Sequence, residues 1–180
     1  GATLYIMARN AEKLAQAAKE IDVNNEGRVH AIPCDVGSKP SVDEAFARIK
    51  ADGACIDILV NCAGVNLRGP LETMPIETWD KVIAINLTGT FLLTQNCFEM
   101  MKKKGGGKIV NVASLMSEIA RPTISPYVAS KGGVKMFTKA IAIEWAKHNI
   151  QANAVIPGYI STEMNTPLIE DEKFNSFICN

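Results

Sequence analysis

Apolar runs of strand length alternate with longer amphipathic segments along the whole chain. The apolar runs cover residues 3–8, 28–33, 56–63, 107–114 and 150–157. They have too little alternation of apolar and polar residues for a sheet with one solvent-exposed face. Helical spacing fills the segments between them, at residues 11–21, 41–52, roughly 75–104, and 126–147. This alternation predicts repeated βαβ units, hence an α/β fold with a doubly wound parallel sheet in three α/β/α layers.

Composition narrows the class of function. The 180 residues are 47% hydrophobic and 21% charged, and 19 Lys and Arg balance 19 Asp and Glu. A chain of this length forms one domain with a sizeable core, and without linkers or repeats we expect a single domain over residues 1–180. Zero net charge provides no field that attracts nucleic acid or an anionic membrane, so we expect a small-molecule partner.

The cysteines argue against metal and disulfide sites. They form no CxxC pair and stand at Cys34, Cys55, Cys62, Cys97 and Cys179. We therefore expect free thiols and no bound metal, and we interpret Cys62, which lacks a base partner, as an inert buried thiol. Free thiols, no signal peptide and no apolar run near 18 residues lead us to expect a cytoplasmic protein without a membrane span.

A tyrosine and a lysine stand four residues apart in SPYVASKGG, residues 125–133, at the start of the last predicted helix. Ser125 is a good N-cap, and Pro126 is a good first helical residue. At about 100° per residue, Tyr127 and Lys131 share a stripe that is otherwise mostly apolar and so faces inward. An ammonium beside a phenol favours the phenolate, which suits a general acid/base tyrosine. The alternative is a lysine that extends to solvent beside a core tyrosine.

Three further polar features lie where a ligand would bind. Ser114 ends the fourth predicted strand, at the edge where an open α/β sheet holds its ligands. The segment NCAG, residues 61–64, ends the third strand, and its small residues let a flat molecule approach the backbone. Asn86 lies in mid-helix among apolar neighbours. Each feature alone has a structural explanation as a turn, a local backbone bond or a satisfied amide, but their combination favours a site.

The segments NCAG, INLTGTF, IVNVAS, YVASK and IPGYISTEM occur in an order and at separations that resemble the short-chain dehydrogenase/reductase family across essentially the whole chain. Within that family, residues 114–168 are similar to the gluconate 5-dehydrogenase group. The resemblance implies a Rossmann-like fold and an oxidoreductase that interconverts a carbonyl and a secondary alcohol, on a sugar acid such as 5-ketogluconate. The alternatives are a 3-oxoacyl thioester reductase, or a noncatalytic truncated relative that acts as a binding partner.

The resemblance also implies roles for individual residues. Tyr127 would donate the proton, and Ser114 would hydrogen-bond the substrate carbonyl. Lys131 would hold the nicotinamide ribose, and Asn86 would anchor a water relay that returns protons to it. The other implied cofactor-binding residues are Asp35, Val36, Asn61, Ala63, Gly64, Pro157, Gly158, Ile160 and Thr162.

The residue after the second strand of a dinucleotide fold selects the cofactor, since an acid accepts the ribose hydroxyls of NAD and an arginine accommodates the phosphate of NADP. This sequence begins where the second strand of the family should, so Arg9, after residues 3–8, stands at that position. We therefore predict a preference for NADP(H), with NAD(H) possible; the alternative is a solvated arginine at the start of a helix.

For the substrate, Arg68 lies at the mouth of the predicted cleft, where it would pair with a carboxylate unless it is a surface loop arginine. Met116, Glu118 and Met164 are further candidates for the pocket wall.

Two expectations concern the molecule as a whole. The family starts with a strand and a glycine-rich turn that this sequence lacks, and its last helix and strand are also missing. We therefore expect this chain to be part of a longer polypeptide, or an incomplete record of one, and to be unable to bind cofactor unaided. We also expect its sheet to be split between its first and third strands.

On the last helix, Met136, Ala140 and Ile143 point away from the Tyr127 stripe. This predicts a homodimer or homotetramer, as the resemblance also implies.

Overall fold

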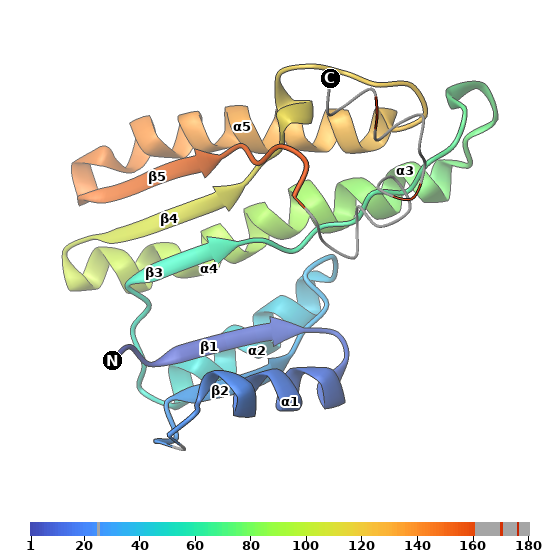
Figure 1. Cartoon of the computed structure of the whole chain (residues 1–180). Coiled ribbons are helices and arrows are strands. Elements are labelled where there is room, and N and C mark those ends of the chain that lie inside the picture. The colour runs from blue at the N-terminus through green and yellow to red at the C-terminus, as the bar shows by residue number, and fades with distance from the viewer. Residues whose placement is uncertain (25, 161–169, 171–175, 177–180) are drawn as a thin grey trace.

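The computed structural model describes residues 1–24, 26–160, 170 and 176, and these residues form a parallel α/β fold, which confirms the predicted class. Its strands are β1 (Leu4–Ala8), β2 (Val29–Pro33), β3 (Ile58–Asn61), β4 (Gly107–Val112) and β5 (Ile150–Val155). Every ladder between neighbouring strands is parallel, as connections through helices require. In Figure 1 the arrows of β1, β3, β4 and β5 point towards the same edge, and β2 is parallel to β1, so the carboxyl ends of the strands lie together there.

The strands form two sheets, one with the order β1-β2 and one with the order β3-β4-β5. The predicted split is therefore confirmed, and among the described residues no ladder joins β1 to β3, although Figure 1 shows them running in the same direction. On β3, Ile58 and Val60 are 62% and 55% exposed, whereas Leu59 packs against the core. Successive residues of β3 thus face opposite sides of the sheet, and this alternation matters for the site below.

The helices are α1 (Ala11–Ile21), α2 (Lys39–Ala51), α3 (Ile76–Ile83), α4 (Gly89–Lys104) and α5 (Ser125–Trp145). Figure 1 shows α1 on one face of the strands and α2, α4 and α5 on the other. The single helix expected over residues 75–104 is divided, because a π-helical turn, η2 (Ala84–Thr88), lies between α3 and α4. Short 3-10 turns are η1 (Leu71–Thr73), η3 (Leu115–Ser117) and η4 (Ala146–His148). No helix in the described ranges is both long and apolar enough to cross a bilayer.

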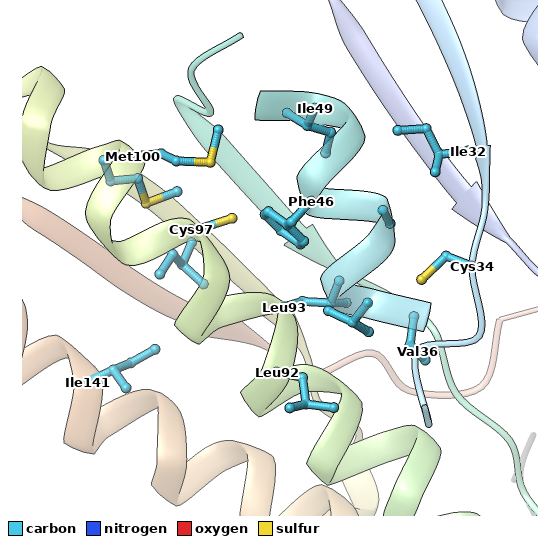
Figure 2. Close-up of a cluster of buried hydrophobic side chains, with 14 of the residues drawn as sticks. Ile32, Cys34, Val36, Phe46, Ile49, Leu92, Leu93, Cys97, Met100 and Ile141 are labelled. Carbon is cyan, nitrogen blue, oxygen red and sulfur yellow. The ribbon is translucent and has the colours of Figure 1, made fainter. Parts of the chain in front are cut away.

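One hydrophobic core holds the two sheets together. Phe46 and Ile49 of α2 belong to one cluster with Leu93 and Cys97 of α4, as Figure 2 shows, and all four side chains are buried. The same cluster reaches strands of both sheets, with Ile32 from β2 and Ile109 and Ile150 from β4 and β5. Burial of each side chain of this size contributes about 1.5–3 kcal/mol relative to its exposure. The packing of α2 against α4 therefore holds together the two sheets, which no strand ladder joins among the described residues.

Helix α5 carries the predicted buried stripe. Lys131, Val134, Thr138 and Ile141 are each at most 4% exposed. The predicted start is shifted, because Ile124 is the N-cap and Ser125 is already helical. The Ser125 hydroxyl does not cap the helix, and among the described residues its buried oxygen has no hydrogen-bond partner.

Candidate active site

A cavity of about 250 Å³ opens at the carboxyl ends of β3, β4 and β5, where an open parallel sheet binds ligands. Segments from four parts of the chain surround it: the loop after β3, the end of β4 with η3, the start of α5, and the loop after β5. Its described lining residues are Cys62, Gly64, Asn66, Arg68, Val112, Ala113, Ser114, Leu115, Met116, Arg121, Ile124, Tyr127, Lys131, Pro157, Gly158, Tyr159 and Ile160.

Tyr127 and Lys131 enter this cavity from the same face of α5, as their spacing predicts. The Lys131 ammonium lies 5.8 Å from the centre of the Tyr127 ring and donates a hydrogen bond to the carbonyl oxygen of Val112 at 2.5 Å. The lysine is 4% exposed, so it does not extend to solvent. Burial lowers the pKa of Lys131 to about 8, an effect that the nearby Cys62 thiol partly opposes.

Ser114 is held at the cavity by the short turn that follows β4. Its backbone is extended, and its hydroxyl accepts a hydrogen bond from the Met116 N–H at 3.2 Å. Ser117, which the sequence reasoning missed, connects this turn to α5: its hydroxyl donates to the carbonyl oxygen of Lys131 at 2.9 Å and accepts from the Ser114 N–H at 3.3 Å. The Ser114 turn therefore has a fixed position relative to the helix that carries Tyr127.

Asn86 lies in the π-helical turn and is 1% exposed. Its side-chain oxygen accepts from the Val65 N–H at 2.8 Å, and its amide nitrogen donates to the Val65 carbonyl at 2.9 Å and to the Ser130 hydroxyl at 3.0 Å. Ser130 in turn donates to the carbonyl oxygen of Tyr127 at 2.8 Å. One buried amide thus links the loop after β3 to the first turn of α5, which explains a polar residue in an apolar helix.

Asn61, which the sequence predicts to bind the cofactor, is buried at the end of β3. It is 5% exposed and lies outside the cavity lining, because on β3 it shares the inward face with Leu59. Its amide donates to Asn111 at 2.8 Å and to Thr94 at 3.2 Å, and Asn111 donates to Thr138 at 2.9 Å. These four side chains form a buried polar chain across β3, β4, α4 and α5, with a structural role.

The next two residues are exposed. Cys62 lines the cavity and is exposed, which corrects the expectation of a buried thiol and follows from the alternation along β3. Ala63 is also exposed. At Gly64, an added Cβ would lie 3.4 Å from Asn86 Oδ1 and 3.6 Å from Lys131 Nζ. A larger side chain at position 64 would therefore occupy the space in front of these two polar groups, and a glycine leaves that space for a flat ligand.

Three predicted cofactor residues follow β1 and β2 at the same edge, outside the described cavity lining. Arg9 is exposed and directly precedes Asn10, the N-cap of α1. The Asp35 carboxylate accepts a hydrogen bond from the Gly37 N–H at 3.0 Å, and Val36 is buried beside Gly89. Pro157, Gly158 and Ile160 line the cavity after β5, as expected, whereas Thr162 lies outside the described residues.

The structure divides the candidates for substrate binding. Arg68 and Met116 line the cavity. Glu118 is not among the described lining residues, and its carboxylate forms an ion pair with Lys135 of α5 at 2.5 Å. Met164 lies outside the described residues. Arg121 and Tyr159 also line the cavity, and the sequence reasoning assigned neither of them to the site.

This arrangement brings a phenol, a hydroxyl and a buried ammonium to one wall of a small cavity. Such a set can hydrogen-bond a carbonyl oxygen and give it a proton, which are the requirements of general acid catalysis. Within the described part of the chain, no group of His, Cys, Asp and Glu side chains has the geometry to hold a metal ion.

Comparison with known proteins gives matches over nearly the whole chain. The family model for short chain dehydrogenases matches residues 1–173. The 5-keto-D-gluconate 5-reductase of Escherichia coli K12 is 41% identical over 180 residues, covering 99% of this chain and 70% of that protein. The gluconate 5-dehydrogenase of Gluconobacter oxydans is 39% identical, with the same coverage. A solved gluconate 5-dehydrogenase from Burkholderia cenocepacia, in complex with NADP and tartrate, is 40% identical with a TM-score of 0.92, covering 99% of this chain and 70% of that one.

Proposed function

This chain belongs to the short-chain dehydrogenase family, an enzyme family of oxidoreductases, and from that premise we propose that it reduces the ketone of a sugar acid such as 5-ketogluconate with NADPH, and catalyses the reverse oxidation. The observation that carries the proposal is the convergence of Ser114, Tyr127 and Lys131 on one cavity at the carboxyl ends of the strands. A noncatalytic relative would have no need to keep all three groups directed into the same cavity.

In the proposed reaction, Ser114 and Tyr127 hydrogen-bond the carbonyl oxygen of the substrate. As negative charge develops on that oxygen, Tyr127 gives it the phenolic proton. The Lys131 ammonium, 5.8 Å from the ring centre, stabilises the phenolate that remains. Asn86 holds the loop after β3 and the first turn of α5 through Val65 and Ser130, so it acts as a positioning residue.

The residues around Gly64 fit a nicotinamide ring and ribose. A glycine leaves space in front of Lys131 and Asn86, and the Pro157 to Ile160 loop supplies a further wall. Lys131 would hold the ribose, and Arg9, after β1, would pair with the 2′-phosphate of NADPH. When bound, the reduced nicotinamide supplies the hydride for the carbonyl carbon. The Burkholderia relative, solved with NADP, supports this choice of cofactor.

Two observations support a sugar acid as the substrate. The relatives from Escherichia coli and Gluconobacter oxydans are named for 5-keto-D-gluconate and gluconate. The described lining contains Arg68, whose guanidinium suits a carboxylate.

The test is NADPH oxidation by the full-length protein, with 5-ketogluconate and a 3-oxoacyl thioester as parallel substrates. We expect a kcat/KM for 5-ketogluconate at least 100-fold above that for the thioester. A higher kcat/KM for the thioester would overturn the assignment of a sugar acid as the substrate. If the protein bound NADPH but turned over neither compound, the proposed reaction would be overturned for both classes of substrate. Arg9→Asp should lower the NADPH to NADH ratio of kcat/KM, while Arg48→Gln, an exposed change on α2, should leave it unchanged.

A further inference from the structure

The Ser117 hydroxyl joins the turn that carries Ser114 directly to helix α5. It donates a hydrogen bond to the carbonyl oxygen of Lys131 at 2.9 Å and accepts one from the Ser114 N–H at 3.3 Å. A hydroxyl can donate and accept at the same time, so one small side chain connects the two elements. A carbonyl oxygen can accept two hydrogen bonds, so the contact with Lys131 does not compete with the helix.

This contact reaches α5 at the turn that carries the candidate site. Lys131 lies one helical turn after Tyr127, and the side chains of both residues line the cavity. Ser117 bonds the backbone of Lys131, so the contact is made to the helix itself and leaves the ammonium to the cavity. The turn η3, which Ser114 caps, is thereby aligned with the part of α5 that carries both groups.

The Ser114 hydroxyl is suited to donate to a substrate from this position. Its oxygen accepts a hydrogen bond from the Met116 N–H at 3.2 Å, which uses a lone pair and does not use the hydroxyl proton. In the proposed reaction Ser114 and Tyr127 bind the same carbonyl oxygen, although they come from different elements. Hydrogen bonds weaken steeply when distance and angle depart from their preferred values, so the reaction depends on how η3 is held against α5.

Two other contacts hold the same turn, and neither replaces the Ser117 hydroxyl. The Leu115 N–H donates to the carbonyl oxygen of Pro157 at 3.0 Å, which joins η3 to the loop after β5 and not to α5. The ion pair between Glu118 and Lys135 does reach α5, but it joins two partly exposed side chains and is weakened by water. Without the Ser117 hydroxyl, η3 would stay attached to the protein and would be less firmly aligned with α5.

We infer that Ser117 is a positioning residue, which holds the Ser114 hydroxyl at the distance from the Tyr127 hydroxyl at which both groups reach one carbonyl oxygen. This inference rests on the proposed function, because it names the residue that aligns the two hydrogen-bond donors of that reaction. A displacement of about 1 Å in such a site can cost about 100-fold in rate. Ser117 is not among the described lining residues, so its change should act on kcat and leave the KM for NADPH unaltered.

The experiment is a double-mutant cycle on Ser114 and Ser117, measured as kcat for reduction of 5-ketogluconate by the full-length protein. Ser117→Ala alone should lower kcat about 10- to 100-fold without a change in the KM for NADPH. Ser117→Thr keeps the hydroxyl and should restore kcat to within about fivefold of wild type. The matched control is Ser125→Ala on α5, which removes a hydroxyl without a hydrogen-bond partner among the described residues and should leave kcat unchanged.

The cycle distinguishes positioning of Ser114 from a general structural role. If Ser117 acts through Ser114, then Ser117→Ala in the Ser114→Ala background should lower kcat by less than about threefold. A general structural role would give the same loss in both backgrounds, about 10- to 100-fold, and would overturn the inference. Wild-type kcat in Ser117→Ala would overturn it as well.

Crystal structures of the wild type and of Ser117→Ala separate this inference from the proposed function, because they need no turnover. Displacement of Ser114 relative to Tyr127 in the variant would support the inference even if 5-ketogluconate is not a substrate. Ser114 in its wild-type position relative to Tyr127 would overturn the inference even if the wild-type protein reduces 5-ketogluconate.

Discussion

The ammonium of Lys131 donates a hydrogen bond to the carbonyl oxygen of Val112, and so ties α5 to the end of β4 at the cavity. The same contact fixes a cation where only 4% of the residue is exposed. Its pKa falls to about 8 from an ordinary 10.5 because the charged form loses water there. The charge that the proposed reaction uses is thus kept at a cost in folding free energy.

That cost predicts a pH dependence of stability. Because the pKa of Lys131 is lower in the folded chain than in the unfolded chain, the charged lysine destabilises the folded state by its full amount below pH 8. Between pH 8 and 10.5 the unfolded chain binds more protons than the folded chain, so this destabilisation decreases as pH rises. Relative to Lys131→Met, the wild type should therefore gain about 2 kcal/mol between pH 7 and pH 9.5. Urea unfolding at the two pH values measures this difference. Lys139→Met, an exposed change on the same helix, is the control, and a flat difference for Lys131→Met would contradict the account.

The buried polar chain predicts a second effect on stability. Thr138 accepts from the Asn111 amide, so Thr138→Val leaves a buried donor without its acceptor and should cost about 1–3 kcal/mol. Thr138→Ser keeps the hydroxyl and should cost about 1 kcal/mol or less. Urea unfolding of both variants compares the two costs. If serine proved as damaging as valine, the loss would come from packing, and the hydrogen bond would not be the reason for a polar residue there.

The outer face of α5 predicts self-association. Met136 and Ile143 are 59% and 81% exposed, opposite the buried stripe. A second copy that packs on this face would bury them, so we expect the full-length protein to form a homodimer or homotetramer. The double change Met136→Lys with Ile143→Lys should shift it towards monomer in light scattering, whereas Ile21→Lys on α1 should not. A wild-type protein that is monomeric at all concentrations would refute this expectation.

Much of the fold could be predicted because its signals are local. Apolar runs and helical spacing placed the five strands within a few residues, and the Tyr127 stripe predicted which face of α5 is buried. The split between β1 and β3 also followed from strand order. The π-helical turn at Asn86 could not be predicted, because it differs from an α-helix by a single residue of hydrogen-bond register that leaves no mark in the hydrophobic pattern.

The site was harder, for two physical reasons. Cys62 was predicted to be buried, although the period-two alternation from Leu59 places Asn61 inside and Cys62 outside. Arg121 and Tyr159 were missed because their contact joins loops 38 residues apart, and loop geometry depends on tertiary packing. The ion pair between Glu118 and Lys135 could not be predicted, because the two residues lie on different elements.

The most direct test of the central claim is the rate of 5-ketogluconate reduction by Tyr127→Phe, with NADPH binding measured on the same protein. The variant removes one hydroxyl and keeps the ring, so we predict a loss of about 100- to 10,000-fold in kcat while NADPH still binds. Tyr5→Phe, which removes a hydroxyl near Asp52 far from the cavity, should retain the wild-type rate. Wild-type kcat in Tyr127→Phe would contradict the assignment of Tyr127 as the proton donor and, with it, the mechanism.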